Sequence, residues 1–454
     1  MCSIDNVKMR LTPRNGIIGM LFLAQLVMFI LRLLTKGVTY YYIARLHVIV
    51  NFESMMLAGS LFMWWRMNAG LQELIVTEKD TPQSQDKRWR KICFNDVAKS
   101  ILLLFLVLTH LSFLFYYCLL GTEPNVLAVV SLLFLAGYIH VLVFIVLFEG
   151  VYLAGKTVEH FYDKKITLVT SPRRRNKMVL VAFLLGLAFM MFGFYSTSAI
   201  PRYTNVNVPI NKMHSGSNVN IALLTDIHIG PTVGKRRMEI IVERTNELHP
   251  DIVAISGDLA DGLVRDLGEA AKPLCELKPK YGVFFATGNH EYMHGNVDEW
   301  FQYLRSCNIT VLHNENRRFK VGQEPLCIAG ADDIYAIKAH FEGHAMNLTK
   351  ALSGCQPDDT VVLLAHQPNA AAVALKDERV NKNIDLILSG HTHAGQMYPF
   401  VPIVYLANAF TRGLYFYEAT STWVYVSAGV NFFGPPVKMW GTCEIINLNL
   451  SGPQ

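Results

Sequence analysis

The sequence predicts an N-terminal α-helical region that crosses a membrane several times, followed by a C-terminal α/β domain. Three observations support this. The chain has 454 residues, enough for more than one structural unit. Hydrophobic residues make up 52% of it, and they are concentrated in residues 1–198. After a linker at 199–216, residues 217–454 alternate short apolar runs with amphipathic segments, which is typical of sheets covered by helices.

Five apolar segments approach the length that spans a bilayer, which is about 20 residues. They cover residues 16–35, 43–65, 100–120, 126–153 and 178–198. Arg45, His47 and Glu53 interrupt the second segment, so a re-entrant or interfacial helix is the alternative there. The apolar run of the first segment is long and lacks a small-residue cleavage site, so we expect a retained anchor and no signal peptide.

The charges between these segments predict the orientation. The loops 66–99 and 156–177 each carry seven Lys or Arg residues, whereas the connection 121–125 carries none. Basic loops are retained in the cytoplasm, as is the tail with Lys8, Arg10 and Arg14. The domain after the fifth segment is therefore expected in the lumen or outside the cell. The net charge of +5 is modest, and these charges favour the lipid bilayer as a partner, with no nucleic-acid-binding patch evident.

Two further features fit an exoplasmic domain. Three N-x-[ST] sequons are consistent with a glycoprotein, at Asn308, Asn347 and Asn449. The domain also contains five cysteines, namely Cys275, Cys307, Cys327, Cys355 and Cys443. Because none is in CxxC spacing, we expect one or two disulfides and no zinc–thiolate site.

The second half repeats one pattern, in which a strand-like apolar run ends and metal-binding side chains follow at once. The runs lie within residues 219–228, 251–261, 281–291, 360–368 and 384–393. They deliver Asp226, His228, Asp258, Asp261, Asn289, His290, Glu291, His366, His391 and His393. The segments 234–248 and 294–306 between them have the pattern of amphipathic helices. Open α/β sheets place their sites at the carboxyl ends of strands, so we expect these side chains to meet.

The residue types indicate a pair of metal ions. Oxygen and imidazole donors without thiolates suit Mn, Fe, Zn or Co. Seven candidate ligands are too many for one tetrahedral zinc, but they suit two adjacent ions that share a carboxylate. His391 and His393 could face one metal cluster, with Gly390 allowing the backbone to turn sharply after the strand.

The series D-x-H, G-D-x-x-D, G-N-H-E, H and G-H-T-H, in this order over residues 217–448, resembles the calcineurin-like metallophosphoesterase superfamily and its YkuE-type branch. The resemblance implies a four-layer αββα sandwich and two divalent cations, among Mn, Fe, Zn, Co or Mg. It implies that the metal ligands are Asp226, His228 and His393 for the first ion, Asn289, His366 and His391 for the second, and Asp258 for both.

The same resemblance implies roles for three neighbouring residues. His290 would be the catalytic imidazole that contacts the phosphate or protonates the leaving oxygen, Glu291 would orient its ring, and Asp261 would support the ligands. The nucleophile would be a metal-activated hydroxide. One departure is Ala394, where related sequences often have glycine, a difference that we expect to concern packing beside the site.

The stretch 397–417 is unusually aromatic and apolar. It fits either the core of a sheet or a hydrophobic lip around the metal site, which would suit a lipid-bearing substrate.

These observations predict a membrane-anchored, metal-dependent phosphoric ester hydrolase that acts on a phosphomonoester or phosphodiester, with a lipid or amphiphile as the favoured substrate class. One alternative substrate is a soluble nucleotide or sugar phosphate. Another alternative is a transporter or receptor with an accessory phosphoesterase domain, because ionisable residues lie within the apolar segments, namely Arg45, Glu53, His140 and Glu149. Snorkelling explains those near segment ends.

Overall fold

The structure is a computed structural model that describes residues 13–35, 37–75, 84–162, 166–294, 297–339 and 341–453. The chain forms two compact units, which are described separately. The first contains residues 1–106 and 152–180, and the second contains residues 107–151 and 181–454. Some basic residues used to predict the orientation lie outside the described residues, namely Lys8, Arg10, Lys79, Lys164 and Lys165.

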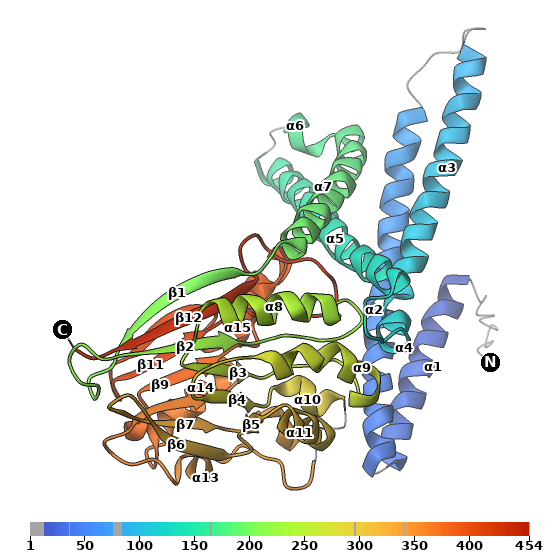
Figure 1. The fold of residues 1–454 in the computed structure, drawn as a ribbon. Coiled ribbons are helices and arrows are strands. Elements are labelled where there is room, and N and C mark those ends of the chain that lie inside the picture. Colours follow the sequence, from blue (N-terminus) through green and yellow to red (C-terminus); the bar gives the residue numbers. More distant parts are fainter. Residues whose placement is uncertain are drawn as a thin grey trace, which may run out of the picture. The chain divides into compact units, whose positions relative to one another are not determined.

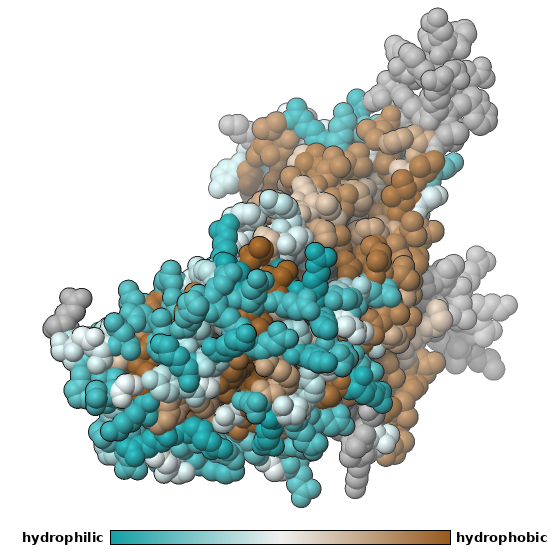
Figure 2. All heavy atoms as spheres, in the orientation of Figure 1, coloured by the Kyte–Doolittle hydropathy of each residue, from teal (hydrophilic) through white to brown (hydrophobic). Residues whose placement is uncertain are grey.

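Seven helices precede the first strand in the described part of the chain (Figure 1). They are α1 (Pro13–Leu34), α2 (Gly37–Ile75), α3 (Ser84–His110), α4 (Ser112–Cys118), α5 (Val126–Tyr162), α6 (Thr167–Thr170) and α7 (Pro172–Ser198). Within the described residues, three stretches are long and apolar enough to cross a membrane: Leu46–Leu74 within α2, the whole of α5 and the whole of α7. The described apolar part of α1, Gly19–Leu34, is shorter. Figure 2 shows hydrophobic residues over these helices and mainly hydrophilic residues over the α/β domain.

The predicted segment 100–120 is not one straight helix. It is divided between α3 and α4, which are bent by 41° at the break. The break falls at Leu111, between the polar residues His110 and Ser112. If the bent pair is one span, the described part of the chain has up to four candidate spans. The number of five therefore stays a prediction.

The α/β domain contains two six-stranded sheets. The first has the order β1-β12-β2-β3-β4-β5, with β1 (Arg202–Pro209), β12 (Glu444–Ser451), β2 (Asn218–Leu224), β3 (Ile252–Ser256), β4 (Gly282–Ala286) and β5 (Ile309–Val311). The second has the order β10-β11-β9-β8-β7-β6, with β10 (Gly413–Tyr417), β11 (Thr422–Val426), β9 (Leu386–Ser389), β8 (Thr360–Leu364), β7 (Glu324–Gly330) and β6 (Glu315–Val321). Both sheets are mixed, because β12 runs antiparallel to β2 and β6 antiparallel to β7.

Helices cover the outer face of each sheet (Figure 1). The helices and 3-10 turns of the domain are α8 (Lys235–Glu247), α9 (Val264–Ala271), η1 (Lys272–Glu276), α10 (Asn289–Met293), α11 (Val297–Ser306), α12 (Tyr335–Ala339), α13 (Leu348–Leu352), α14 (Pro368–Lys376), η2 (Asn381–Asn383), η3 (His393–Gly395), η4 (Tyr398–Phe400) and α15 (Val401–Ala407). The predicted amphipathic segments 234–248 and 294–306 correspond to α8 and α11.

The core has three layers of buried apolar residues, one between the sheets and one beneath each helical layer. Ile221 and Leu388 belong to the layer between the two sheets. Trp300 of α11 packs on the outer face of the first sheet, and Ala371 of α14 packs on the outer face of the second. The predicted four-layer αββα sandwich is therefore confirmed.

The predicted linker 199–216 contains a strand. β1 pairs in parallel with β12 over its whole length, from Arg202 opposite Glu444 to Pro209 opposite Ser451. The α/β domain therefore begins near residue 202, earlier than the predicted 217. The sequence around β1 has few apolar residues because β1 is an edge strand, and its partner lies about 240 residues away along the chain.

Four of the five domain cysteines pair. The disulfides are Cys275–Cys307 and Cys327–Cys355, whereas Cys443 is a buried free thiol. Two disulfides agree with the expected number.

Candidate metal centre

The predicted ligands follow the carboxyl ends of neighbouring strands. Asp226 follows β2, Asp258 follows β3 and Asn289 begins α10 just after β4, while His366 follows β8 and His391 follows β9. Backbone hydrogen bonds join the loops after β2 and β3, since the amides of Asp226 and His228 donate to the carbonyls of Gly257 and Asp258. The two sheets thus bring all five segments to one edge.

Several of these ligand residues have left-handed backbone conformations. The φ values are 53° for Asp226, 51° for His228, 53° for Asp258, 71° for His391 and 47° for His393. Such conformations are uncommon for residues other than glycine and cluster at functional sites. The fold therefore holds these side chains in position at a cost in backbone energy.

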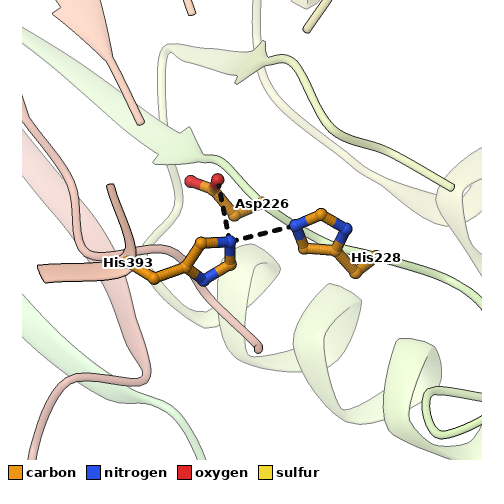
Figure 3. Close-up of side chains that lie close together, drawn as sticks. All are labelled: Asp226, His228 and His393. Carbon is orange, nitrogen blue, oxygen red and sulfur yellow. Dashed lines mark hydrogen bonds and ion pairs between the residues drawn. The ribbon is translucent and has the colours of Figure 1, made fainter. Parts of the chain in front are cut away.

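The first ligand cluster consists of Asp226, His228 and His393, which point toward one another in Figure 3. The Nε2 atoms of His228 and His393 are 3.0 Å apart. His393 Nε2 also lies 3.3 Å from Asp226 Oδ1. All three residues are buried. This is the set that the resemblance implied for the first metal.

The second ligand cluster consists of Asn289, His366 and His391, with Asp258 beside them. His391 Nδ1 lies 2.8 Å from Asn289 Oδ1, and His366 Nε2 lies 3.0 Å from Asp258 Oδ2. The rings of His366 and His391 are 5.4 Å apart between centroids. The structure thus brings together the four residues expected around the second metal.

Asp258 lies between the two clusters. Its Oδ1 accepts a hydrogen bond from the backbone amide of His290. Its Oδ2 faces both clusters, at 3.0 Å from His366 Nε2 and 3.8 Å from His228 Nε2. One carboxylate oxygen is therefore held by the backbone and the other is directed at both metal positions.

The two acidic residues beside the clusters, Asp261 and Glu291, make contacts that differ from those expected. Glu291 does not face the ring of His290, because its carboxylate accepts hydrogen bonds from the backbone amides of Asp258, Leu259 and Gly288. Asp261 lies against the imidazoles instead, with Oδ1 2.9 Å from His228 Nδ1 and 2.8 Å from His290 Nδ1. Glu291 is adjacent to His290 in sequence, but on α10 consecutive side chains point in different directions. Asp261 is therefore placed both to support the imidazole of His228 and to orient that of His290, the position that had been expected of Glu291.

The charges around the clusters favour cations. Burial alone would lower the pKa of His290, but the carboxylates of Asp258 and Asp261 outweigh this effect and raise it to about 9. The pKa of His366 is likewise raised by Asp258 against the opposing effect of burial. By contrast, burial and the neighbouring His366 lower the pKa of His391 to about 4. His391 is thus held neutral, the form in which an imidazole binds a metal.

The arrangement of His366 shows that the residues fit divalent cations. Its Nδ1 faces the carbonyl oxygen of Ser256 at 2.8 Å. A carbonyl only accepts, so the neutral ring must carry its proton there. In that form the lone pair of Nε2 faces Asp258 Oδ2 at 3.0 Å, so the pair needs a positive charge, which either a proton on Nε2 or a bound cation supplies. Nitrogen and carboxylate donors suit borderline divalent ions.

Gly390 has a different purpose from the predicted sharp turn. Its φ is not in the left-handed region. A Cβ atom at this position would instead clash with the carboxylate of Asp226 and the side chain of Thr225.

Ala394 differs from the expectation in another way. It is in the left-handed conformation with φ 53°. At position 394 a glycine would adopt this left-handed conformation more easily than alanine does. The expected difference in packing is therefore a difference in backbone conformation.

Two residues near the site were missed by sequence reasoning. Phe433 places its ring 4.7 Å from His290 and 5.4 Å from His228, measured between centroids. Lys438 is buried, and its ammonium donates to the carbonyls of Ala428, Gly429 and Asn431. Neither residue belongs to a motif, and the hydrophobic stretch around Phe433 was the one available signal.

Comparison with known proteins agrees with the geometry. The family model for calcineurin-like phosphoesterases matches residues 219–395. A Caenorhabditis elegans metallophosphoesterase-family protein is 48% identical over 442 residues, which covers 92% of each chain. The Danio rerio transmembrane protein with metallophosphoesterase domain is 35% identical over 410 residues and 89% of each chain. A solved dimetal phosphatase from Danio rerio covers 50% of this chain and 90% of its own, with 11% identity and a TM-score of 0.32.

A four-layer fold with His and Asp clusters at its strand ends defines a metal-dependent phosphoesterase, for which divalent metal ions are the cofactors. The chain belongs to the calcineurin-like phosphoesterase family. Its similarity to the transmembrane protein with metallophosphoesterase domain includes the helical region, because the alignment covers 89% of both chains. The protein is accordingly a membrane-associated hydrolase.

Proposed function

We propose that this enzyme holds two divalent ions and hydrolyses the phosphoester of a lipid or another amphiphile at the outer surface of the membrane. The observation that carries the two-metal assignment is the position of Asp258 Oδ2, which faces both ligand clusters. Bound ions would activate a water molecule and offset negative charge on the phosphate. Mn, Fe, Zn, Co and Mg are all compatible with the donor set.

The side chains of the protein supply proton transfer and positioning. Asp261 faces Nδ1 of His290 at 2.8 Å, which directs Nε2 of the same ring toward the centre, 4.0 Å from Asp258 Oδ2. The two carboxylates favour the protonated ring, so His290 can donate a proton to the leaving oxygen. The ring of Phe433 packs edge-on against His290 and restricts the orientation of the imidazole.

Contacts with the apolar helices support a lipid substrate. Phe433, beside the catalytic imidazole, packs edge-on against Tyr116 of α4, with ring centroids 6.0 Å apart. Tyr398 of η4, in the loop that follows His393, contacts Phe189 of α7 at 5.6 Å. The neighbouring Met397 clusters with Met190 of α7 and with α5. If α7 is a span, as its length and composition allow, these contacts would bring the metal centre next to the membrane.

The stretch 397–417 supports the interpretation as a lip. Instead of forming sheet core, its first part forms η4 and α15, and α15 packs on the turn η3 that contains His393. The side chains of Ile403, Tyr405 and Leu406 on α15 are exposed. An exposed apolar helix beside a membrane helix is suited to lie in the bilayer interface.

We expect Leu406→Ser to lower turnover on a lipid phosphate in vesicles by roughly 30-fold, since a leucine side chain contributes about 2 kcal/mol when it is buried in an apolar phase. Turnover on a short-chain, water-soluble phosphoester should change less than about twofold. Leu406 is 90% exposed, so the substitution leaves the core intact. The measurement compares the two substrates for the full-length enzyme in lipid nanodiscs.

Val373→Ser is the matched control, because Val373 is also an exposed apolar residue and lies on α14, on the outer face of the second sheet. It should leave both activities unchanged. Equal losses on both substrates in Leu406→Ser would contradict the lipid lip and favour a soluble nucleotide or sugar phosphate.

We also propose that the catalytic domain is exoplasmic. The basic segment 156–177 runs from the end of α5 into the first turns of α7, and its charge favours the cytoplasm, so the rest of α7 would carry the domain across. The two disulfides agree with an oxidising compartment. Of the sequons, Asn308 and Asn347 are exposed, whereas Asn449 lies in β12 and donates to Asn207 of the adjacent strand. We therefore expect glycans at the first two positions.

The domain should be protected when protease is added to sealed vesicles whose cytoplasmic face is outward, and it should be cut once detergent opens them. Glycosidase treatment should increase its mobility, and this shift should be absent in Asn308→Gln combined with Asn347→Gln. Cleavage in sealed vesicles, with lumenal marker proteins intact, would overturn the placement. The protein's own cytoplasmic loops provide a positive control for protease access.

The function itself is tested with the full-length chain. Purified enzyme, stripped of metal and reloaded separately with Mn²⁺, Zn²⁺, Mg²⁺ or Fe²⁺, is assayed on lipid and soluble phosphoesters. Activity that depends on added metal supports a phosphoesterase, and a higher rate on vesicle lipid supports the substrate class. A variant with Asp226→Asn provides the control for contaminating phosphatases. Activity that persists in this variant would reject the assigned site.

A further inference from the structure

A second group of metal-binding side chains lies outside the centre described above. His313 follows β5, Asp332 follows β7, and His344 lies in the loop before α13. His313 Nδ1 is 2.8 Å from Asp332 Oδ1, and His344 Nδ1 is 3.7 Å from Asp332 Oδ2. One ligand atom from each residue lies within 4.8 Å of the other two. None of these residues belongs to the motifs described above for the catalytic centre.

The three segments are held together before any ion binds. Asn314, next to His313, has a buried side chain with φ 49°. Its Oδ1 accepts hydrogen bonds from the backbone amides of Asp332 and Asn347, and its Nδ2 donates to the carbonyl of Ala345. Asn314 thereby joins the ends of β5 and β7 to the loop that contains His344. The candidate ligands are therefore pre-organised by the backbone.

The carboxylate of Asp332 has unused binding capacity. Its side chain is fully buried, and Oδ2 has no hydrogen-bond partner among the described residues. A buried carboxylate oxygen without a donor is costly, and a cation would remove that cost. The hydroxyl of Tyr292 lies near the same group of residues. It is 3.3 Å from His344 Nδ1, a long hydrogen bond, and 3.1 Å from the hydroxyl of Thr287. Oδ1 of Asp332 is contacted by His313 Nδ1 at 2.8 Å, whereas Oδ2 faces Nδ1 of His344 at 3.7 Å.

The far side of His344 resembles the support of a metal ligand. Its Nε2 lies 3.5 Å from the carboxylate of Asp298 on α11. Histidines that bind metals usually donate their second N–H to a carboxylate or a carbonyl, which fixes the tautomer. This tautomer would leave the lone pair of Nδ1 facing Asp332.

The spacing also suits a tetrahedral ion. Metal–ligand bonds of about 2.0–2.1 Å in tetrahedral geometry separate the ligand atoms by about 3.3 Å. His313 Nδ1 lies 2.8 Å from Oδ1 of Asp332 and His344 Nδ1 lies 3.7 Å from Oδ2, so each imidazole is within about 0.5 Å of this separation from one of the two carboxylate oxygens. Two imidazoles and one carboxylate are the donor types of zinc sites, with water as the fourth ligand.

We propose that His313, Asp332 and His344 bind a third divalent ion of the zinc class, separate from the catalytic pair. It would be structural, since it would tie β5, β7 and the loop before α13 together. The His344 ring packs edge-on against Tyr292 of α10, with 5.5 Å between ring centroids, so the ion would also brace the helix that carries Asn289 and His290. The proposal does not depend on the proposed substrate or on the number of catalytic ions.

The first test is metal content. Full-length protein in detergent is stripped of metal, reloaded with Zn²⁺, passed through a desalting column and analysed by mass spectrometry. We expect His313→Ala to hold one ion per chain fewer than wild type. His214→Ala is the matched control, because His214 also lies 2.8 Å from a buried carboxylate, that of Glu324, but has no third ligand assigned. The control should keep the wild-type content.

His313 is partly exposed, with 24% of its side chain accessible, so His313→Ala should fold; gel filtration and circular dichroism check this. Equal metal content in folded His313→Ala and wild type would overturn the proposal. Because the result is a difference between two proteins, it does not depend on how many ions the catalytic centre holds.

A second variant gives a signal that only metal binding can produce. His313→Cys replaces an imidazole with a thiolate, which is also a zinc-site ligand. Loaded with Co²⁺, this variant should show a near-ultraviolet thiolate-to-cobalt absorption band that wild type lacks. Adding Asp332→Asn should reduce the band. If His313 only donates a hydrogen bond to Asp332, no band will appear and the site is rejected.

Discussion

Asp258→Asn is expected to release metal from both catalytic positions and to abolish measurable turnover. The substitution keeps the size of the side chain but removes the charge of Oδ2, the atom that faces both clusters. Residues that only support metal ligands weaken metal binding by about 10–100-fold when they are replaced, so a shared ligand should cost more than this. The measurement is elemental analysis of the purified full-length variant alongside turnover.

The matched control for this prediction is His290→Ala, which removes a buried imidazole from the same centre without removing a proposed ligand. Its metal content should remain at the wild-type level. If Asp258→Asn retains the full complement of metal, Asp258 does not bridge the ions. Loss of a single ion would instead assign Asp258 to one position alone.

His290→Ala is expected to lower turnover by about 10²–10⁴-fold on a substrate with a poor leaving group, the usual contribution of a positioned general acid. On a substrate whose leaving alcohol has a low pKa, the loss of turnover should be much smaller, because the leaving oxygen departs as an anion and needs no proton. The physical basis is the pair of carboxylates, Asp258 and Asp261, that keep the imidazole in its charged form.

Asp261→Asn provides the companion measurement. It removes the carboxylate that faces Nδ1 of His290 but leaves the ring in place, so its effect should have the same leaving-group dependence at a smaller magnitude. Near-normal turnover of His290→Ala with the poor leaving group would rule out the acid role. A similar loss with both leaving groups would indicate that His290 positions the phosphate and does not protonate the product.

The metal ligands themselves could be predicted because each follows a strand that is recognisable from its own residues. The run before Asp226 and the run before His391 are apolar and short, and parallel strands of one domain present their carboxyl ends at a common edge. The family resemblance then assigned each ligand to a cluster, and the distances agree, as in the contact between His391 and Asn289.

The membrane region was predicted less completely. Hydropathy identifies apolar segments, but it does not measure where a helix bends, and the segment 100–120 bends at Leu111. A bend depends on local hydrogen bonding and on the helices packed around it. The identity of the spans in α2, α5 and α7 agrees with the predicted segments 43–65, 126–153 and 178–198.

By itself, the sequence determined the domain order, the sheet-based architecture and the set of proposed metal ligands, because each depends on patterns within about ten residues. The tertiary structure alone decided that β1 belongs to the first sheet, since its partner β12 is distant along the chain. It alone decided that Asp261 rather than Glu291 faces His290. It also brought His313 together with Asp332 and His344. In each case the contact joins residues that are far apart along the chain. The period of a helix or strand relates only residues close in sequence, so it could not predict these contacts, and only the folded sheets and loops bring the residues together.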